Sequence, residues 1–310
     1  MIEGQEDVTW EEWVALARAC EENGLEGLFR SDHYASVMGV FSRGALDAWA
    51  TLAALAARTE RIRLGSLVSP ATFRHPSVLA KAVVTADHVS GGRVELGLGA
   101  GWNEREHSMY GFPFPEQRVR LELFAEQLEI VHRQWTEDSF DFEGRHYRLE
   151  GCRALPKPVQ KPHPPLIVGG RGGRGTVEPA VRWADEYNTI FASVKELRDR
   201  RRKLDEACER AGRDPGTLRF SHMTMSVVGV DRSELEERAR RAASLTGADD
   251  PQAFLAEGRA TGVVGTVDEV VEQLRAAEAA GVERVFLQHL DHRDLEMVAL
   301  VGREVVPRVA

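Results

Sequence analysis

One stretch in the first third of the chain has the pattern of a complete β-α-β unit. Residues 62–68 form an apolar run rich in β-branched side chains, and Ser69-Pro70 ends that run. Pro76 then opens an apolar-periodic segment that closes at Ser90-Gly91-Gly92, and a second apolar run follows at residues 94–99. Two apolar strands joined by one helix are expected to lie parallel and adjacent, with a right-handed crossover. This stretch therefore predicts a parallel sheet covered by helices.

The same unit repeats along the chain. Eight candidate strands occur, at residues 1–4, 27–30, 62–68, 94–99, 166–168, 187–191, 218–229 and 284–288. Each is followed by a helical segment, which predicts a (β/α)8 TIM barrel of the α/β class, in one domain over residues 1–310. An open doubly wound sheet is the alternative fold. Insertions are expected after the fourth strand, as a polar and aromatic segment up to Tyr147, and after the seventh, as a helical excursion over residues 231–260.

The first candidate strand is shorter than the others. Only Met1 to Gly4 precede Gln5 and the helix capped at Thr9. At about 3.3 Å per residue, this segment is too short to line the full height of a barrel wall. We therefore expect the natural start to lie upstream, and we expect unpaired backbone groups on the second and eighth strands at the bottom of the barrel. Adding residues there should raise the melting temperature.

The overall charge and the cysteines bear on partners and location. The formal net charge is −9, which argues against a nucleic-acid or anionic-membrane surface. Cys20, Cys152 and Cys208 are widely spaced and form no CxxC pair, as expected in a reducing cytoplasm. No apolar run is long enough for a transmembrane helix. We expect a cytoplasmic homodimer that acts on a small organic molecule and binds neither nucleic acid nor membrane.

In a barrel, active sites lie in the loops after the carboxyl ends of the strands. Polar and glycine residues follow most of the apolar strands in this chain. The candidates from these loops are Gln5, Asp32, His33, Ser69, Trp102, Asn103, Glu104, Asn188 and His289. The Asp32-His33 pair has a purely structural alternative, as a helix cap or a partner for a neighbour. No metal site is expected, because no set of strand-end carboxylates accompanies the acids and histidines of residues 289–294.

A glycine-rich segment follows the fifth strand. Its members are Gly169, Gly170, Arg171, Gly172, Gly173 and Arg174. Such a backbone can direct its N–H groups at an anion, and the start of the next helix adds its dipole. The alternative is a flexible loop with solvated arginines, because glycine runs alone have low specificity. A second cluster, residues 97–101, lacks the third glycine of a dinucleotide fingerprint and predicts a backbone that passes close to something flat.

Four motifs, in the order and spacing that the strands require, resemble those of the luciferase-like monooxygenase superfamily. They are GLEGLFRSDHY, RIRLGSLVSPATFRHPSVLAK, DHVSGGRVELGLGAGWNEREHSMYG and PPLIVGGRGGRGT. The similarity spans essentially the whole chain and points to the branch that uses the deazaflavin coenzyme F420, in a mycobacterial-type subgroup. The motifs discriminate poorly between F420 and FMN. An FMN-dependent monooxygenase is therefore the alternative function, and a non-catalytic flavin-binding barrel is a further one.

The resemblance implies where a cofactor would lie. Its ring would lie across the strand ends, backed by a bulge with a non-proline cis peptide at Leu67-Val68. Ser69 and Asn103 would also contact the cofactor, and its phosphate would lie in the loop of residues 169–175. The implied reaction is hydride transfer between an organic substrate and the deazaflavin.

The resemblance also implies catalytic residues. Asp32 and His33 would lie near the reactive edge of the ring, with His33 the leading proton donor because imidazole titrates near neutral pH. Members that oxidise alcohols or sugar phosphates carry a glutamate where this chain has Trp102. Their substrate chemistry is therefore not carried over. The residues expected to contact substrate are Gln5, Trp102, Glu104, Asn188 and His289.

Overall fold

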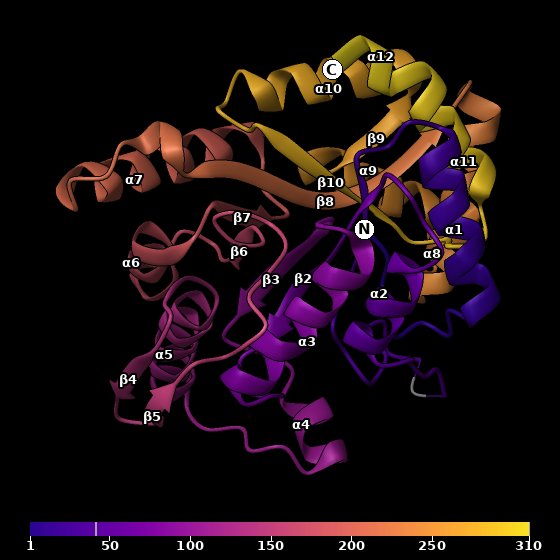
Figure 1. Ribbon diagram of the computed structural model, residues 1–310. Helices are drawn as coiled ribbons and strands as arrows, with labels where there is room; N and C mark the ends of the chain where they lie inside the picture. The colour runs from indigo at the N-terminus through magenta and orange to yellow at the C-terminus, as the bar shows by residue number, and fades with distance from the viewer. Residues whose placement is uncertain (41, 310) are drawn as a thin grey trace.

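The computed structural model describes residues 1–40 and 42–309, with parallel strands at the centre and helices around them (Figure 1). The strands are β1 (Gly27–Arg30), β2 (Arg63–Pro70), β3 (Val94–Gly99), β4 (Phe140–Glu143), β5 (Arg148–Cys152), β6 (Leu166–Gly169), β7 (Glu186–Ile190), β8 (Arg219–Gly229), β9 (Val263–Thr266) and β10 (Arg284–His289). The main sheet has the order β1-β2-β3-β6-β7-β8-β10, and β9 pairs with β8. All of these pairings are parallel, as the sequence predicts.

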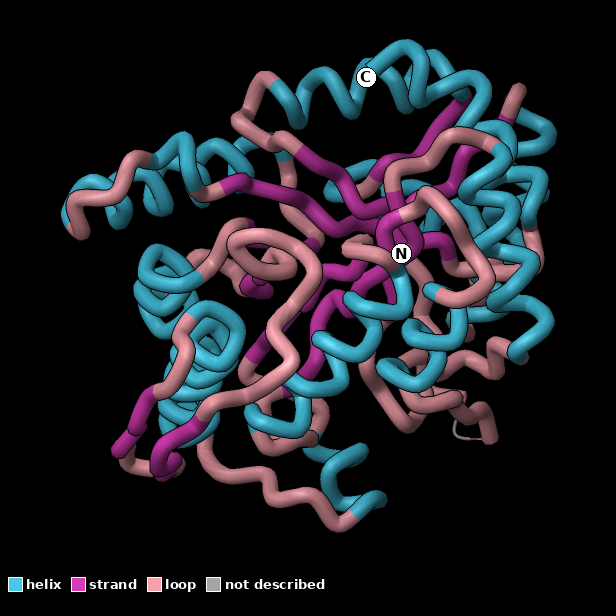
Figure 2. The backbone as a smooth tube through the Cα atoms, in the orientation of Figure 1, coloured by secondary structure: helices cyan, strands magenta, loops and turns pink. Residues whose placement is uncertain are grey.

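The helices alternate with the strands of this sheet and cover its outer face. They are α1 (Trp10–Glu22), α2 (Ala48–Ala56), α3 (Pro76–Ser90), α4 (Glu104–Tyr110), α5 (Gln117–Thr136), α6 (Arg174–Trp183), α7 (Val194–Arg210), α8 (Arg232–Thr246), α9 (Pro251–Thr261), α10 (Val267–Glu278), α11 (Leu295–Leu300) and α12 (Val306–Val309), with short η1 (Pro215–Thr217) and η2 (Val301–Val305) turns. Figure 2 shows the helices surrounding the strands. Within the described residues, no helix combines the length and apolar character that a bilayer crossing requires.

The β-α-β unit predicted for residues 62–99 is present. β2 pairs in parallel with β3, and α3 connects them. α3 begins after His75, with Pro76 in its first turn, where the missing N–H of proline has no cost. It ends at Gly91, which takes the left-handed φ of 66° that favours glycine. Local sequence signals are therefore sufficient to set both ends of this helix.

The predicted first strand is reduced to Met1 and Ile2, which bond to both edges of the main sheet. Ile2 forms an isolated parallel bridge with β1 and donates its N–H to the Phe29 carbonyl at 2.9 Å. On the other side, the Met1 ammonium donates to the Leu287 carbonyl at 2.9 Å, and the His289 N–H donates to the Met1 carbonyl at 2.9 Å. These two residues occupy the remaining strand position between β10 and β1. The predicted shortening of the first strand is confirmed.

Both predicted insertions are present. After β3, the fourth barrel strand, the chain forms α4, α5 and the β4–β5 hairpin, which lies beside α5 and away from the main sheet (Figure 1). Phe140 and Phe142 of the hairpin pack with Ile130 of α5. After β8, the seventh barrel strand, α8, α9 and β9 intervene before α10. The hairpin strands, α4 and β9 were not predicted as elements, because each is short and is stabilised by a neighbouring element.

Side chains fill the inside of the barrel in layers. Near the amino ends of the strands, Arg284 pairs with Glu95 at 2.7 Å and with Glu186 at 3.3 Å, and all three are buried. Two residues further along β10, Phe286 belongs to an apolar layer. That layer contains Phe29, Leu67, Ile167, Met223 and Phe286. The interior is therefore packed between the two ends of the barrel.

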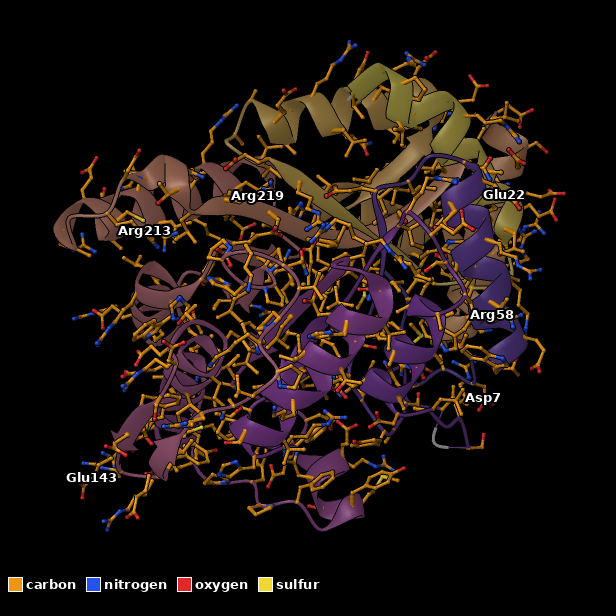
Figure 3. The ribbon with its side chains drawn as sticks, viewed as in Figure 1. Asp7, Glu22, Arg58, Glu143, Arg213 and Arg219 are labelled. Carbon is orange, nitrogen blue, oxygen red and sulfur yellow. The ribbon has the colours of Figure 1, made fainter. Side chains whose placement is uncertain are left out.

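The main hydrophobic core lies outside the strands, between the sheet and the helices. Trp13 of α1 and Leu96 of β3 are fully buried within it. Charged side chains cover the outer faces of the helices and the hairpin. Glu22, Arg58 and Glu143, for example, are exposed and point away from the sheet (Figure 3).

Candidate active site

A histidine–carboxylate pair lies at the carboxyl ends of the strands. His33 follows β1, and its Nδ1 lies 2.6 Å from Glu106 Oε2 in the first turn of α4. Glu106 is buried, and its other oxygen accepts the backbone N–H groups of Tyr34 and Ala35. Because this carboxylate is fixed by three donors, it holds the imidazole in one orientation. His33 Nε2 makes no hydrogen bond to the described residues.

The environment of this pair changes the proton affinity of both groups. Burial by itself lowers the pKa of His33, but the hydrogen bond and the negative charge of Glu106 outweigh it and raise that pKa. Burial likewise raises the pKa of Glu106, yet its contacts with His33 and the two backbone N–H groups leave it lowered. The pair therefore favours a charged carboxylate beside a histidine that can hold a proton near neutral pH.

Trp102 flanks the histidine. Its ring centroid lies 5.7 Å from that of His33, in an edge-on arrangement, and the residue is 65% exposed. A tryptophan this exposed offers an apolar surface to a bound molecule. Asn103 and Glu104 follow it at the start of α4. Asn103 is the N-cap of α4, and Glu104 is exposed in the first turn.

Asp32 lies beside the histidine in sequence but faces a different set of partners. Its Oδ2 accepts from Ser69 Oγ at 2.7 Å and from Arg74 Nη1 at 2.5 Å, and the residue is fully buried. Arg74 also donates to Asp47 at 2.7 Å. With its oxygens engaged by Ser69 and Arg74, Asp32 is placed to fix the loop after β1. This geometry favours a positioning role for Asp32 and Ser69 over direct catalysis.

The peptide between Leu67 and Val68 is cis, as the resemblance implies, and the pairing of β2 with β3 shifts register at this point. The Val68 side chain lies against three glycines. A Cβ at Gly97 or Gly99 would lie 2.9 or 2.7 Å from Val68, and one at Gly169 would lie 3.1 Å away. The glycines that were predicted to pass close to something flat therefore make room for Val68 itself. The bulge presents Leu67 and Val68 at the carboxyl ends of the strands.

Tyr187 of β7 holds the glycine-rich loop, which leads into the start of α6. Gly172 has a φ of 81°, and its N–H donates to Tyr187 Oη at 2.8 Å. The same hydroxyl lies 2.9 Å from Thr176 Oγ1, and a side chain at Gly170 would collide with it. Gly173 is the N-cap of α6 and offers no side chain to the helix N–H groups. These N–H groups and the helix dipole fit an anionic group such as a phosphate.

A further cation beside this loop was not singled out from the sequence. Arg200 of α7 packs against Gly172, and its guanidinium donates to Thr189 Oγ1 at 2.5 Å and to the Ile190 carbonyl at 3.0 Å. Arg174, in contrast, extends along α6 to Glu178 and is exposed. Arg171 is also exposed. Arg200 is therefore a partly buried cation beside this loop, and its guanidinium also pairs with Glu196 at 3.5 Å.

Gln5 belongs to a buried polar network at the amino-terminal segment. Ser31 Oγ donates to Gln5 Oε1 at 2.5 Å, and Gln5 Nε2 donates to Glu3 at 2.8 Å. Gln288 Nε2 donates to the other oxygen of Glu3 at 2.6 Å. Gln5 is fully buried and bonded to Ser31 and Glu3, so its side chain is not free for a substrate.

Asn188 and His289 are also engaged within the protein. Asn188 is buried inside the barrel, and its Nδ2 donates to Ser221 Oγ at 2.9 Å. His289 faces outward, with Nε2 3.1 Å from the Asp294 carbonyl, and burial lowers its pKa to about 4. Because side chains alternate along a strand, Gln288 points inward and His289 does not. The predicted substrate contact of His289 does not fit this geometry.

Comparison with known proteins identifies the family. Residues 2–284 match the model of the luciferase-like monooxygenases. The chain belongs to this family. An uncharacterized protein of Mycobacterium tuberculosis is 36% identical over 169 residues, which cover 54% of this chain and 58% of that protein. The chain therefore matches little more than half the length of this relative.

Longer matches extend over nearly the whole chain. An F420-dependent glucose-6-phosphate dehydrogenase of Nakamurella multipartita is 29% identical over 320 residues, covering 96% of this chain and 92% of that enzyme. An F420-dependent secondary alcohol dehydrogenase structure has a TM-score of 0.82 at 20% identity and covers 98% of this chain and 96% of its own. Structures at this identity establish the fold alone, and they confirm the luciferase-like TIM barrel. The family comprises oxidoreductases and monooxygenases, with F420-dependent and FMN-dependent members.

Three site residues of this family member were not predicted from its sequence. Glu106 occurs three residues after the helix cap Asn103, and this spacing is typical of a capping pair. The sequence pattern therefore gives no sign that Glu106 contacts His33. Arg200 lies in a helix with many other charges, where a solvated role is the usual one, and Arg74 is a single charge in the segment that follows a predicted strand. Each becomes apparent only when the fold brings distant segments together.

Proposed function

We propose that this chain is an F420-dependent oxidoreductase that transfers a hydride between the deazaflavin and a small organic substrate. The His33–Glu106 pair at the mouth of the barrel is the observation that carries the proposal. Hydride transfer to or from an oxygen-bearing carbon requires a proton to move at that oxygen, and a positioned histidine supplies this function. The 29% identity to an F420-dependent dehydrogenase over nearly the whole chain supports the same cofactor.

The cofactor would be held by groups on both sides of the strand ends. Leu67 and Val68 would back its ring, and the loop of residues 169–175 would receive its phosphate, with Arg200 adjacent. When bound, F420 supplies the carbon that accepts or donates the hydride. FMN has a phosphate too, and a relative named as an FMNH2-dependent dimethylsulfone monooxygenase is 24% identical over 95% of this chain. FMN is therefore the competing cofactor.

The protein's own contribution is a positioned proton carrier. His33 Nε2 would accept the hydroxyl proton of a substrate being oxidised, or return it to a carbonyl being reduced. Glu106 holds the opposite nitrogen and stabilises the imidazolium that forms. Trp102 covers one side of His33 and limits access of water to it.

We also propose that the protein is a cytoplasmic homodimer that acts without nucleic-acid or membrane partners. The net charge of −9 disfavours binding to anionic polymers and surfaces. On α3, Val78 and Val89 are 61% and 46% exposed, which provides apolar area for a partner subunit. Size-exclusion chromatography with light scattering tests the dimer, and a monomeric mass at micromolar concentration would contradict it.

A substrate panel tests the proposed reaction. The purified protein is incubated with F420 and a set of alcohols and sugars, and with reduced F420 and a set of carbonyl compounds, while cofactor absorbance is followed. At least one compound should change the redox state of F420, and His33→Ala should abolish the change. Oxygen-dependent turnover with reduced FMN, without any F420 reaction, would assign the chain to the monooxygenases instead.

A further inference from the structure

The surface that a substrate meets beside His33 is apolar. Trp102 lies edge-on to the imidazole, with 5.7 Å between the ring centroids, and it is 65% exposed. His33 is nearly covered, since only 10% of its side chain is exposed. A molecule that reaches the imidazole from solvent therefore passes over the more open indole. An aromatic ring this exposed offers a large contact area to the apolar part of a bound molecule.

The charges around His33 disfavour a charged substrate. Burial by itself lowers the pKa of this histidine, and the hydrogen bond to Glu106 and the negative charges of Glu106, Glu3 and Asp32 outweigh it and leave the pKa raised. An anion at the imidazole would meet these three carboxylates. A cation would meet the proton that the ring holds. The electrostatics of the site therefore favour an uncharged molecule.

The arginines of the neighbouring segments already have partners. Arg74, after β2, pairs with two carboxylates. Arg43, after β1, pairs with Glu6 at 2.8 Å. Arg105 of α4 is not free either. A phosphate or carboxylate brought to this side of the mouth would therefore have to displace an existing interaction, and breaking a largely buried ion pair is costly.

Uncharged polar side chains at the mouth are also engaged with one another. Gln5 and Gln288 each donate to Glu3, at 2.8 and 2.6 Å. Asn188 donates to Ser221 at 2.9 Å. A sugar needs several donors and acceptors to replace the water on its hydroxyl groups, because a polar group buried without a partner is unfavourable. These amides are committed within the protein, so the site suits a molecule with a single hydroxyl group.

We propose that the substrate of the His33 site is an uncharged, apolar alcohol, or the carbonyl compound formed from it. This inference rests on the proposed function and names its substrate class. The apolar body lies on the indole of Trp102, and the oxygen lies at His33 Nε2. In the oxidation, the hydrogen on carbon leaves as a hydride to oxidised F420, and the hydroxyl proton passes to His33. One C–H and one O–H bond break, the carbon–oxygen bond becomes double, and F420 takes up two electrons.

A set of matched alcohols tests the substrate class in the protein loaded with F420. Cyclohexanol is compared with 4-hydroxycyclohexanecarboxylate, 4-aminocyclohexanol and glucose, which add a negative charge, a positive charge or further hydroxyl groups to a similar ring. Cyclohexanol should have the highest kcat/KM, by about tenfold or more over each charged analogue and about 100-fold or more over glucose. A charged analogue or glucose as the best substrate would overturn the proposal.

Substitution of Trp102 tests the apolar contact. Trp102→Ala should raise KM for cyclohexanol about 10- to 50-fold and leave kcat within a few-fold, whereas KM for 2-propanol, which covers little of the indole, should change less than about threefold. Trp102→Phe should restore most of the loss. Leu155→Ala is the matched control, since Leu155 is 66% exposed in the connector before β6. Equal losses for the two alcohols would show that Trp102 only positions His33, and would overturn its contact with substrate.

A binding measurement separates this inference from the proposed function. Cyclohexanone and cyclohexanecarboxylate are titrated by calorimetry into the protein loaded with F420 or with FMN. Tighter binding of cyclohexanone supports the substrate class even where no hydride reaches F420, and only the proposed function then fails. Equal or tighter binding of the carboxylate overturns the substrate class, while F420 turnover with any compound of the set keeps the proposed function.

Discussion

The two ends of the barrel differ in how completely their polar groups are satisfied. At the carboxyl end, Glu106 has three donors, and Glu3 joins Gln5 and Gln288 in a buried network. At the amino end, the Met1 amino group and the edges of β1 and β10 border a cavity of about 790 Å³. A fully satisfied network fixes side chains for chemistry, whereas open strand edges cost stability. Changes at the first end should therefore alter activity, and changes at the second should alter stability.

The largest effect is expected at the mouth, from His33→Ala. Loss of the proton carrier should lower kcat by about 10²- to 10⁴-fold. The affinity for cofactor should stay near that of the unaltered protein, and the variant should remain folded at the assay temperature although Glu106 loses its partner. His88→Ala, on the exposed face of α3, is the matched control and should keep full activity. Near-normal turnover of His33→Ala would remove this residue from the catalytic step, and a collapse of cofactor affinity would make its role structural.

At the amino end, Glu95→Gln should lower stability and leave activity intact, the reverse of the result expected for His33→Ala. Arg284 would lose its nearer carboxylate partner inside the barrel, and breaking a buried ion pair in this way costs about 3–5 kcal/mol of unfolding free energy. Denaturant unfolding should detect the loss, with Glu22→Gln on the surface of α1 as control. Specific activity at low temperature should be retained. Loss of activity without loss of stability would show that the two ends are not independent.

Glu106→Gln should produce a smaller change at the mouth, about 10- to 50-fold in kcat, because His33 remains but is held less well. The direction in which the pH profile of kcat/KM should shift follows from the pKa of His33. Glu106 raises the pKa of His33, so its replacement should lower that pKa. For substrate oxidation, where neutral His33 is required, the acid limb of the kcat/KM profile should move to lower pH. An unshifted limb would mean that another group controls the profile.

The same pair makes a pH-dependent contribution to folding. Because the pKa of His33 is raised in the folded protein, this stabilisation is complete below about pH 6.5 and is lost as pH rises through the folded pKa. Glu106→Gln should therefore destabilise the protein more at pH 6 than at pH 9. An equal loss at both pH values would argue against an imidazolium–carboxylate pair.

The smallest effects are expected in the glycine-rich loop. Arg200→Ala should weaken cofactor binding about tenfold, and Arg171→Ala should weaken it only a few-fold. The Arg171 effect should be larger at low salt, because an exposed charge is screened by ions. Fluorescence titration of both variants at two salt concentrations measures this. A stronger effect of Arg171 than of Arg200 would reverse the assignment of the anion site.

The barrel was predictable because its signals are local and repeated. Residues 94–99 and the helix ends at Pro76 and Gly91 were located correctly from composition and turn residues alone. The elements that were missed, such as α4, have little apolar periodicity, since only Glu106 and His107 of this helix are buried. Short elements of this kind are determined by tertiary contacts, which the hydrophobic periodicity of a sequence does not reveal.

The position of the candidate site residues at the strand ends was predictable, but their contacts were predictable only in part. His33 and Trp102 were placed at the mouth because they follow strands. The side on which a residue faces was harder to predict, as His289 illustrates, because a shift of one residue reverses the face of a strand. Partners distant in sequence, such as Glu106 for His33, 73 residues apart, become visible only in the folded chain.

Cofactor choice tests the central claim most directly. F420 and FMN, each in oxidised form, are titrated into the same preparation and followed by fluorescence. The proposed function requires F420 to bind at least about tenfold more tightly than FMN, and Arg200→Ala to weaken this binding. Equal affinity for the two cofactors, or tighter binding of FMN, would contradict the assignment of this chain as an F420-dependent oxidoreductase.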